Sequence, residues 1–312
     1  MKNSFLNILF LIFILCILLA IIMHPNKTLK SASKGLNTWF NIVVPSLLPF
    51  FIISNILIEI GFVKLIGQLL EPLIRFLFNV SGAGAFSFSI SAVSGYPVGA
   101  KIVSDMRQSG IISQSEANKM ICFSSTSGPL FMVGTVATGM LGNPSLIPLI
   151  IYPHYLGAIT LGVLMRFYKK SNTILKLKLG NTLPNEKTNH SIGSLLTEAV
   201  QKSLGTITLI GGFIIFYSVL VELLFIYIPF NNIIKVLCAS NLTTINIDIL
   251  KGFVAGLFEI TTGCNIISNA DVNILNKIML INFLVAWSGF SIHSQAMSFI
   301  NRTDIDAKLY VL

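Results

Sequence analysis

Long apolar runs separated by short polar segments make up most of the chain. Residues 4–23 are almost entirely Ile, Leu and Phe and carry no charge. A run of this length spans a hydrocarbon core of ~30 Å, whereas the apolar part of a signal peptide has only ~7–15 residues. We therefore expect a retained membrane helix here, with a signal peptide as the alternative. Further apolar membrane segments are expected at residues 38–60, 119–140, 145–165, 204–228, 246–268 and 275–300.

Two segments between these spans have a different pattern. Residues 82–103 are apolar but interrupted by glycine and proline, which indicates a re-entrant hairpin or a broken helix buried within the protein. Residues 62–80 carry polar side chains at helical intervals, which predicts a helix lying at the interface or against other helices. The polar side chains of that stretch are Lys64, Gln68, Glu71 and Arg75.

Basic residues are concentrated in the long hydrophilic segment 166–190, which contains a single acid, Glu186. The positive-inside rule predicts that this segment is cytoplasmic. By the same rule Lys27, Lys30 and Lys34 make the loop after the first span cytoplasmic, which leaves the N-terminus outside.

Composition agrees with a membrane protein. The chain is 54% hydrophobic and only 11% charged, with a mean hydropathy of +0.81, whereas soluble domains carry about 25% charged residues. The net charge of +9 is explained by loops facing an anionic leaflet, and the sequence has no basic helix or aromatic platform for nucleic acid. The four cysteines lack the spacing of a metal or redox site, and no hydrolase, zincin or phosphate-loop motif is present. We expect no catalytic residues, no metal and no cofactor.

Short matches at a nearly constant offset relate the two halves of the chain. Leu57–Glu59 has a counterpart in Leu220–Glu222, and Ser127–Gly128 has one in Ser288–Gly289. Repeated halves with a broken helix in each are typical of secondary transporters. We therefore predict an all-α polytopic membrane protein of two repeated halves, expected to be inverted, with chance similarity as the alternative. The predicted units are an N-terminal helix and loop (1–37), a first repeat (38–165), a basic cytoplasmic loop (166–190) and a second repeat (191–312).

One carboxylate lies inside an apolar segment and is a candidate for function. Glu259 is surrounded by apolar and hydroxyl residues, including Thr261 and Thr262. A carboxylate in that position needs a cation, a proton or a helix N-terminus as a partner. We expect either a solute or ion site formed by these three residues, or a structural ion pair.

The interrupted segment 82–103 offers a second candidate. Its glycines allow close backbone approach, and its proline can begin a new helix whose N-terminus presents free N–H groups and a partial positive charge. A lysine follows one turn later, so we expect an anion-binding hairpin; a packing hairpin with a snorkelling lysine is the alternative. The candidate residues are Ser94, Gly95, Tyr96, Pro97, Gly99 and Lys101.

Polar residues at matching places in the two halves complete the predicted site. Serine in membrane helices often only bonds its own backbone, but two such clusters at corresponding repeat positions indicate a shared role in binding. The candidates are Ser125, Thr126, Ser127 and Gly128 in the first half and Ser288, Ser291, His293 and Gln295 in the second.

Three of these motifs carry a resemblance to a known family. Pro45–Phe50, Ser94–Lys101 and Thr126–Pro129 are similar to segments of the sporulation integral membrane proteins of the nucleoside-recognition (Gate) superfamily, and the resemblance covers nearly the whole chain. Relatives in that superfamily include concentrative nucleoside transporters built from inverted repeats with paired hairpins. The resemblance implies a transporter that moves dipicolinic acid across the outer forespore membrane during spore formation. A nucleoside carrier and a non-transporting scaffold for spore envelope assembly are the alternatives.

The resemblance also implies the surroundings of the protein. The expected partners are the lipid bilayer and a small solute, either dipicolinate or a nucleoside-like molecule, together with further copies of the chain or other sporulation membrane proteins. Members of the family are expected to continue into one more C-terminal membrane helix. Here the hydrophilic residues 301–308 are followed only by Leu309–Leu312, so we expect a shortened copy whose activity is in question.

Overall fold

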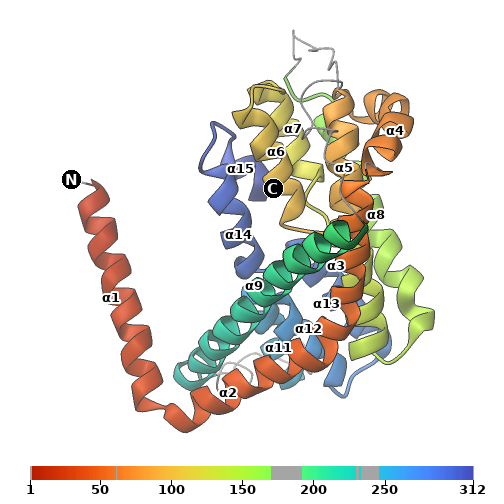
Figure 1. Ribbon diagram of the computed structural model, residues 1–312. Coiled ribbons are helices and arrows are strands. Elements are labelled where there is room, and N and C mark those ends of the chain that lie inside the picture. Colours follow the sequence, from red (N-terminus) through yellow and green to blue (C-terminus); the bar gives the residue numbers. More distant parts are fainter. Residues whose placement is uncertain (1, 61, 170–191, 230–231, 233–245, 312) are drawn as a thin grey trace.

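The computed structural model describes residues 2–60, 62–169, 192–229, 232 and 246–311, and every regular element within these ranges is a helix (Figure 1). Three helical stretches are long and apolar enough to cross a membrane: Pro144–Met165, Ile192–Tyr227 and Ile274–Ile300. The bent pair Asn7–Met23 and Pro25–Val43 forms a fourth candidate. The prediction of an all-α membrane protein is therefore confirmed.

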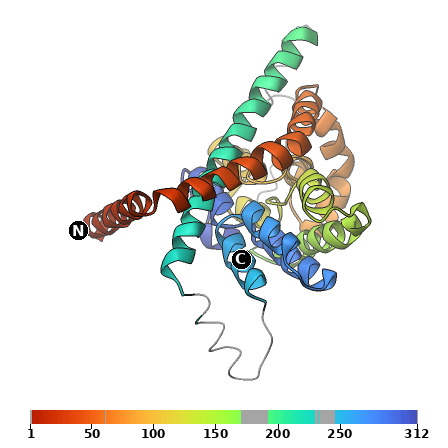
Figure 2. The ribbon, with the colours of Figure 1, turned by 90° about the horizontal axis from the view of Figure 1, so that it is seen from below.

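The N-terminal helix stands apart from the rest of the molecule. Helix α1 (Lys2–Met23) projects away from the other helices in both views (Figures 1 and 2), and apolar side chains from Ile8 to Met23 are exposed. Its chain direction changes by 101° at the start of α2 (Pro25–Thr38), where Pro25 has no N–H to continue the helical ladder. A helix with apolar side chains exposed in this way is suited to lipid.

Helix α2 is amphipathic, although the sequence predicts a loop there. It buries Thr28, Ser31 and Gly35, and it packs on the 36-residue helix α9 (Ile192–Tyr227). The Ser31 hydroxyl donates to the Ser218 carbonyl oxygen at 2.7 Å. The three lysines of the predicted loop are exposed.

A π-helical segment links α2 to the next helix. Segment η1 (Trp39–Val43) continues directly into α3 (Val44–Glu59), which also packs on α9. The Val44 N–H bonds to the Trp39 carbonyl oxygen, five residues back. Pro49 cannot donate to the helical ladder, and it lies just beyond this wider turn. Residues 38–59 are therefore helical and continue α2 as one kinked helix. That they span a membrane stays a prediction.

The segment rich in glycine folds as a hairpin. Helix α4 (Phe62–Phe78) packs against α5 (Gly82–Ser94), as expected for a helix lying against other helices. After α5 the chain turns at residues 95–97 and returns as α6 (Val98–Gln108). Gly95 makes this turn with a φ of +79°, a conformation that glycine adopts without a steric penalty. Of the two predicted alternatives, the structure shows a helical hairpin; that it re-enters the membrane stays a prediction.

A second hairpin replaces the single span expected at residues 246–268. Helices α11 (Ile247–Phe258) and α12 (Ile260–Asn269) are joined by Glu259 alone and pack along each other. A Cβ added to Gly263 would lie 2.2 Å from the Gly256 Cα, so only glycine permits this close approach. Apolar periodicity does not reveal the reversal, because both arms of the hairpin are apolar.

Each half also contains an interrupted helix. In the first half, α7 (Gln114–Phe123) is separated from the π-helix η2 (Phe131–Met140) by the non-helical residues 124–128. In the second half, α13 (Ile274–Trp287) is separated from α14 (Phe290–Ile300) by Ser288 and Gly289, both with positive φ. The 3₁₀ turn η3 (Pro144–Leu146) leads into α8 (Ile147–Met165), which completes the first half.

The two hairpins lie at opposite ends of the molecule. In Figure 1 the α5/α6 hairpin occupies the upper part of the view and the α11/α12 hairpin the lower part. Each half therefore supplies one hairpin and one interrupted helix in the same order along the chain. That the halves are related as inverted repeats stays a prediction.

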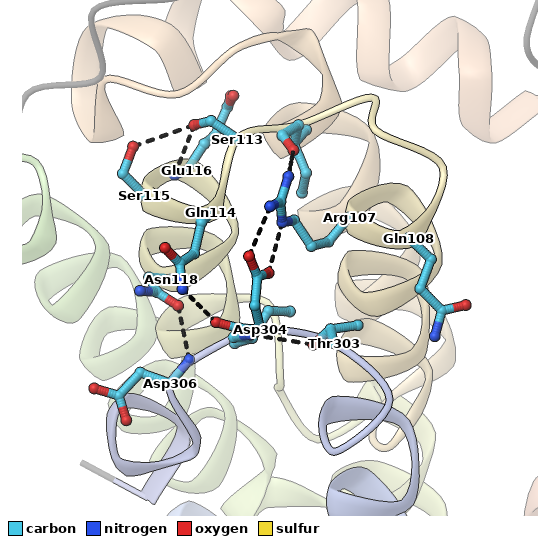
Figure 3. Close-up of polar contacts among 12 residues, drawn as sticks. Arg107, Gln108, Ser113, Gln114, Ser115, Glu116, Asn118, Thr303, Asp304 and Asp306 are labelled. Atoms are coloured by element: carbon cyan, nitrogen blue, oxygen red, sulfur yellow. Dashed lines mark hydrogen bonds and ion pairs between the residues drawn. The ribbon is translucent and has the colours of Figure 1, made fainter.

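The C-terminal segment is fixed to the first half by polar contacts (Figure 3). Two nitrogen atoms of the Arg107 guanidinium lie 2.7 Å from the two carboxylate oxygens of Asp304. The Asp306 N–H donates to the Asn118 Oδ1 at 3.0 Å, just before the short helix α15 (Ala307–Val311). These contacts place α15 against α7.

One prediction concerns a part of the chain outside the described residues. The basic loop is described only as far as Lys169, so its predicted cytoplasmic position is not tested. Most of residues 229–244 also lie outside the described ranges.

Candidate functional site

The tips of the two hairpins and parts of the two interrupted helices meet around a small cavity, which we call the hairpin-tip cavity. Its volume of about 70 Å³ is well below the ~300–1,000 Å³ of typical ligand pockets. In this conformation it has room for only a few water molecules, so a solute enters only when side chains move apart. Eight predicted site residues line it: Ser94, Gly95, Tyr96, Ser127, Gly128, Glu259, Ser291 and Gln295.

Two glycines allow the first hairpin tip to cross the first interrupted helix. A Cβ added to Gly95 would lie 2.6 Å from the Gly128 backbone nitrogen, and one added to Gly128 would lie 3.3 Å from the Gly95 nitrogen. Backbone therefore contacts backbone at this crossing. Gly95 was predicted to permit close approach, and the structure shows that the approaching group is another segment of the same chain.

The structure does not place Gly99, Pro97 or Lys101 in the wall of this cavity. A Cβ on Gly99 would lie 1.5 Å from the Ser124 carbonyl oxygen, so the space expected for a ligand is filled by protein. The Lys101 side chain is 52% exposed and its Nζ lies 2.7 Å from Asp105. A long flexible cation keeps its charge in water rather than in a closed apolar cavity.

Glu259 forms the N-terminal cap of α12. Its two carboxylate oxygens accept hydrogen bonds from the Thr261 N–H at 3.0 Å and the Thr262 N–H at 2.6 Å. Only 2% of the residue is exposed, and no ion pair with it is found among the described residues. Of the partners considered for this carboxylate, the helix N-terminus is the one observed.

The two threonines beside Glu259 serve the hairpin rather than the cavity. Neither Thr261 nor Thr262 lines the hairpin-tip cavity. The Thr262 hydroxyl lies 3.0 Å from that of Ser218 on α9, which connects the second hairpin to the long helix.

Neighbouring helices satisfy the backbone of the first interruption. The Ser127 N–H donates to His154 Nε2 at 2.8 Å, and the Tyr155 hydroxyl donates to the Ser127 carbonyl oxygen at 3.2 Å. The Thr126 N–H donates to the Ser91 hydroxyl at 3.2 Å. Non-helical backbone is stable within a membrane protein when protein groups replace water in this way.

The remaining predicted residues lie around a larger cavity, which we call the second cavity. Its volume is about 390 Å³, and it lies on the other side of the two helix interruptions. In the first half, Ser125 and Thr126 line the second cavity, whereas Ser127 and Gly128 line the hairpin-tip cavity. In the second half, Ser288 and His293 line the second cavity, whereas Ser291 and Gln295 line the hairpin-tip cavity. The first interruption, together with Ser288 and the start of α14, therefore forms the partition between the cavities.

Sequence reasoning missed the apolar wall of the hairpin-tip cavity. Val43, Leu47 and Phe51 recur every four residues on one side of the kinked helix, and Ile210 and Ile214 do so on α9. This spacing is a helical-face signal in the sequence. It does not distinguish a cavity wall from any other buried face, because apolar residues form both.

The charge of the hairpin-tip cavity is set by one acid. Glu259 is among its lining residues, whereas no lysine or arginine lines it within the part of the chain that the structure describes. The remaining polar lining consists of hydroxyl, amide and backbone groups. This lining suits a neutral polar solute; an anion there requires a proton or a cation to offset the carboxylate.

Comparison with known proteins gives two matches. Residues 40–144, which include the first hairpin tip and the first interruption, match the protein family described as Gate, nucleoside recognition. The sporulation integral membrane protein YlbJ of Bacillus subtilis (strain 168) is 35% identical over 315 residues, which cover 96% of this chain and 77% of the relative. No solved structure matches the chain.

Proposed function

Since the chain belongs to the family of sporulation integral membrane proteins with a nucleoside-recognition (Gate) domain, we propose that it carries a small polar solute across a membrane. The observation that supports this most strongly is the hairpin-tip cavity. There, two hairpins from opposite ends of the molecule and two interrupted helices converge on one small space that combines an apolar wall with a few polar groups. Sites of this construction are typical of secondary transporters.

Dipicolinate is the solute that the family resemblance favours, and we propose the outer forespore membrane as the place of transport. The start of α6, just after the first hairpin tip, has no side-chain cap, but the Val98 N–H donates to the Gly95 carbonyl oxygen and Gly99 packs against the Ser124 carbonyl oxygen, so this helix end gives dipicolinate no open site in this conformation. The Glu259 carboxylate opposes a dianion, so we propose that dipicolinate enters with a proton or cation.

A nucleoside is the second candidate, and a specific observation favours it. Hydroxyl and amide side chains line the cavity without a lysine or arginine among the described residues. A neutral, hydroxyl-rich solute makes hydrogen bonds there without bringing a second negative charge beside Glu259.

Flux measurements distinguish these solutes from one another and from a scaffold role. Purified protein in liposomes is given dipicolinate or uridine, and uptake is compared for wild type, Gln295→Ala and Gln201→Ala. Gln295 lines the cavity whereas Gln201 is exposed on α9. We expect Gln295→Ala to lower uptake of the carried solute roughly fivefold, the effect of losing one hydrogen bond, and Gln201→Ala to leave it unchanged.

The outcome identifies the function directly. Uptake of one solute assigns it, and sensitivity to Gln295→Ala assigns the cavity. Correctly inserted protein that moves neither dipicolinate nor uridine would favour the scaffold over both carriers.

A further inference from the structure

The second cavity has the size and lining of a binding site in its own right. Its volume of about 390 Å³ falls within the ~300–1,000 Å³ of ligand pockets. We propose that it binds an uncharged planar heteroaromatic molecule that carries amide-type hydrogen-bonding groups at its edge. This inference does not depend on the transport proposal, because the partition separates this site from the hairpin-tip cavity.

Aromatic rings form one wall of the second cavity. The His293 ring lies edge-to-face between Trp287 and Tyr310, with centroid distances of 4.7 and 5.5 Å. All three residues line the cavity. The Trp287 indole is itself fixed, because its Nε1 donates to the Leu257 carbonyl oxygen at 3.0 Å. Rigid rings at fixed angles favour a flat ligand that packs against them.

Two residues of the same lining, Asn282 and His154, have unused hydrogen-bonding capacity. Asn282 donates through Nδ2 to the Leu149 carbonyl oxygen at 2.9 Å, whereas its Oδ1 is buried without a hydrogen-bond partner among the described residues. A buried acceptor of this kind is stabilised by a ligand N–H. His154 accepts the Ser127 N–H at Nε2, so its neutral ring carries the proton on Nδ1 and can donate to a ligand carbonyl oxygen or ring nitrogen.

In the part of the chain that the structure describes, the second cavity has a lining without charged side chains, and its rim lies at the apolar surface of the molecule. Both features exclude an ionic ligand. No lysine, arginine, aspartate or glutamate lines the second cavity within the described ranges. Pro153 and Gly157 on α8 and Phe283 and Ala286 on α13 belong to its lining and are exposed. Both helices belong to candidate membrane spans, so the rim faces the apolar surface. A ligand that enters there with a net charge would lose its hydration without gaining an ion pair.

A matched pair of probes tests the preference for an uncharged ligand. Pyridine-2,6-dicarboxamide and dipicolinate share one ring and one shape, but the first is neutral and the second is a dianion. The chain has two tryptophans, so Trp39→Phe leaves Trp287 as a fluorescent reporter in the cavity wall. We expect saturable quenching by the dicarboxamide, with dipicolinate binding at least about tenfold more weakly.

Two glycines on helix surfaces provide a variant and its control. A Cβ at Gly157 or at Gly205 meets no atom within 4 Å, so both positions accept a larger side chain without a clash. Gly157 lines the second cavity and Gly205 on α9 does not. In the Trp39→Phe background, Gly157→Leu should abolish quenching by filling the cavity, and Gly205→Leu should leave it unchanged.

Polar recognition and independence from transport are tested in the same assay. Asn282→Leu should raise the Kd of the dicarboxamide about tenfold, since the ligand N–H loses its acceptor. Gln295→Ala, which alters the hairpin-tip cavity, should leave this Kd unchanged even if it stops uptake. The proposal is overturned if the dicarboxamide gives no saturable quenching, if Gly157→Leu binds it like wild type, or if dipicolinate binds as tightly.

Discussion

The first hairpin tip crosses the first interruption at Gly95. This position requires glycine for two separate reasons. Gly95 has a positive φ, and its missing side chain also leaves room for the Gly128 backbone. Gly110 shares the positive φ but has nothing within 4 Å of its Cβ position. A comparison of substitutions at Gly95 and Gly110 therefore separates the cost of backbone strain from the cost of steric crowding.

We expect Gly95→Ala to destabilise the protein more than Gly110→Ala. The positive φ costs an L-residue ~1–2 kcal/mol at either position, and overpacking at Gly95 adds ~1–3 kcal/mol. Thermal unfolding in detergent measures both variants. Equal losses of stability would show that the two backbones separate easily, contrary to the crossing described above.

Glu259 caps helix α12 and also lines the hairpin-tip cavity. Substitutions distinguish the structural role from the role in transport. Removing the cap by Glu259→Ala should cost ~0.5–2 kcal/mol of stability, as should Asn273→Ala, which removes the cap of α13. Glu259→Gln keeps one acceptor oxygen and should cost less. Because Glu259 also lines the hairpin-tip cavity, Glu259→Gln should reduce uptake per folded molecule, whereas Asn273→Ala should not. Unchanged uptake by Glu259→Gln would leave the residue as a cap alone.

At the scale of elements, the C-terminal segment depends on the ion pair between α6 and Asp304. The guanidinium of Arg107 holds the pKa of the Asp304 carboxyl below its usual value. A lowered folded-state pKa means that the ion pair contributes fully above the unfolded-state pKa and is lost as pH falls through the folded-state pKa. Figure 3 shows that this contact is the centre of the polar cluster that fixes residues 303–306.

We expect Arg107→Met to release this segment at neutral pH. Amide hydrogen exchange of residues 303–311 should become faster, and wild type should show the same change only in acid, below the usual range of an aspartate pKa. Lys101→Met is the control, because it removes an exposed ion pair within α6 alone. Slow exchange in Arg107→Met would show that the Asn118 and Gln114 contacts hold the segment without the ion pair.

At the scale of the whole molecule, orientation in the membrane follows from the charge of the long loop. Residues 166–190 carry many basic side chains and one acid, and translocating them is unfavourable. In a variant without the native cysteines, Lys176→Cys should react with an impermeant thiol reagent only from the cytoplasmic side. Labelling from the opposite side would reverse the predicted orientation of both halves.

Local features of the chain determined the membrane class and the first hairpin, and they marked the polar residues at 125–128. Apolar runs, clustered glycines and a polar motif inside an apolar segment act through nearby backbone and through solvent, so they can be interpreted without knowing the fold. The same reasoning identified eight residues of the hairpin-tip cavity, because polar groups in apolar segments are rare and costly.

Only the tertiary structure decided which of these residues meet. It divided the predicted site between two cavities, left Lys101 in an exposed ion pair, and assigned Glu259 to a helix N-terminus. It also turned residues 246–268 into a hairpin through contacts between glycines seven residues apart. The physical reason is that an apolar side chain has the same sequence signature whether it faces lipid, a neighbouring helix or a cavity. Its surroundings are fixed by packing between distant segments, which periodicity along the chain does not specify.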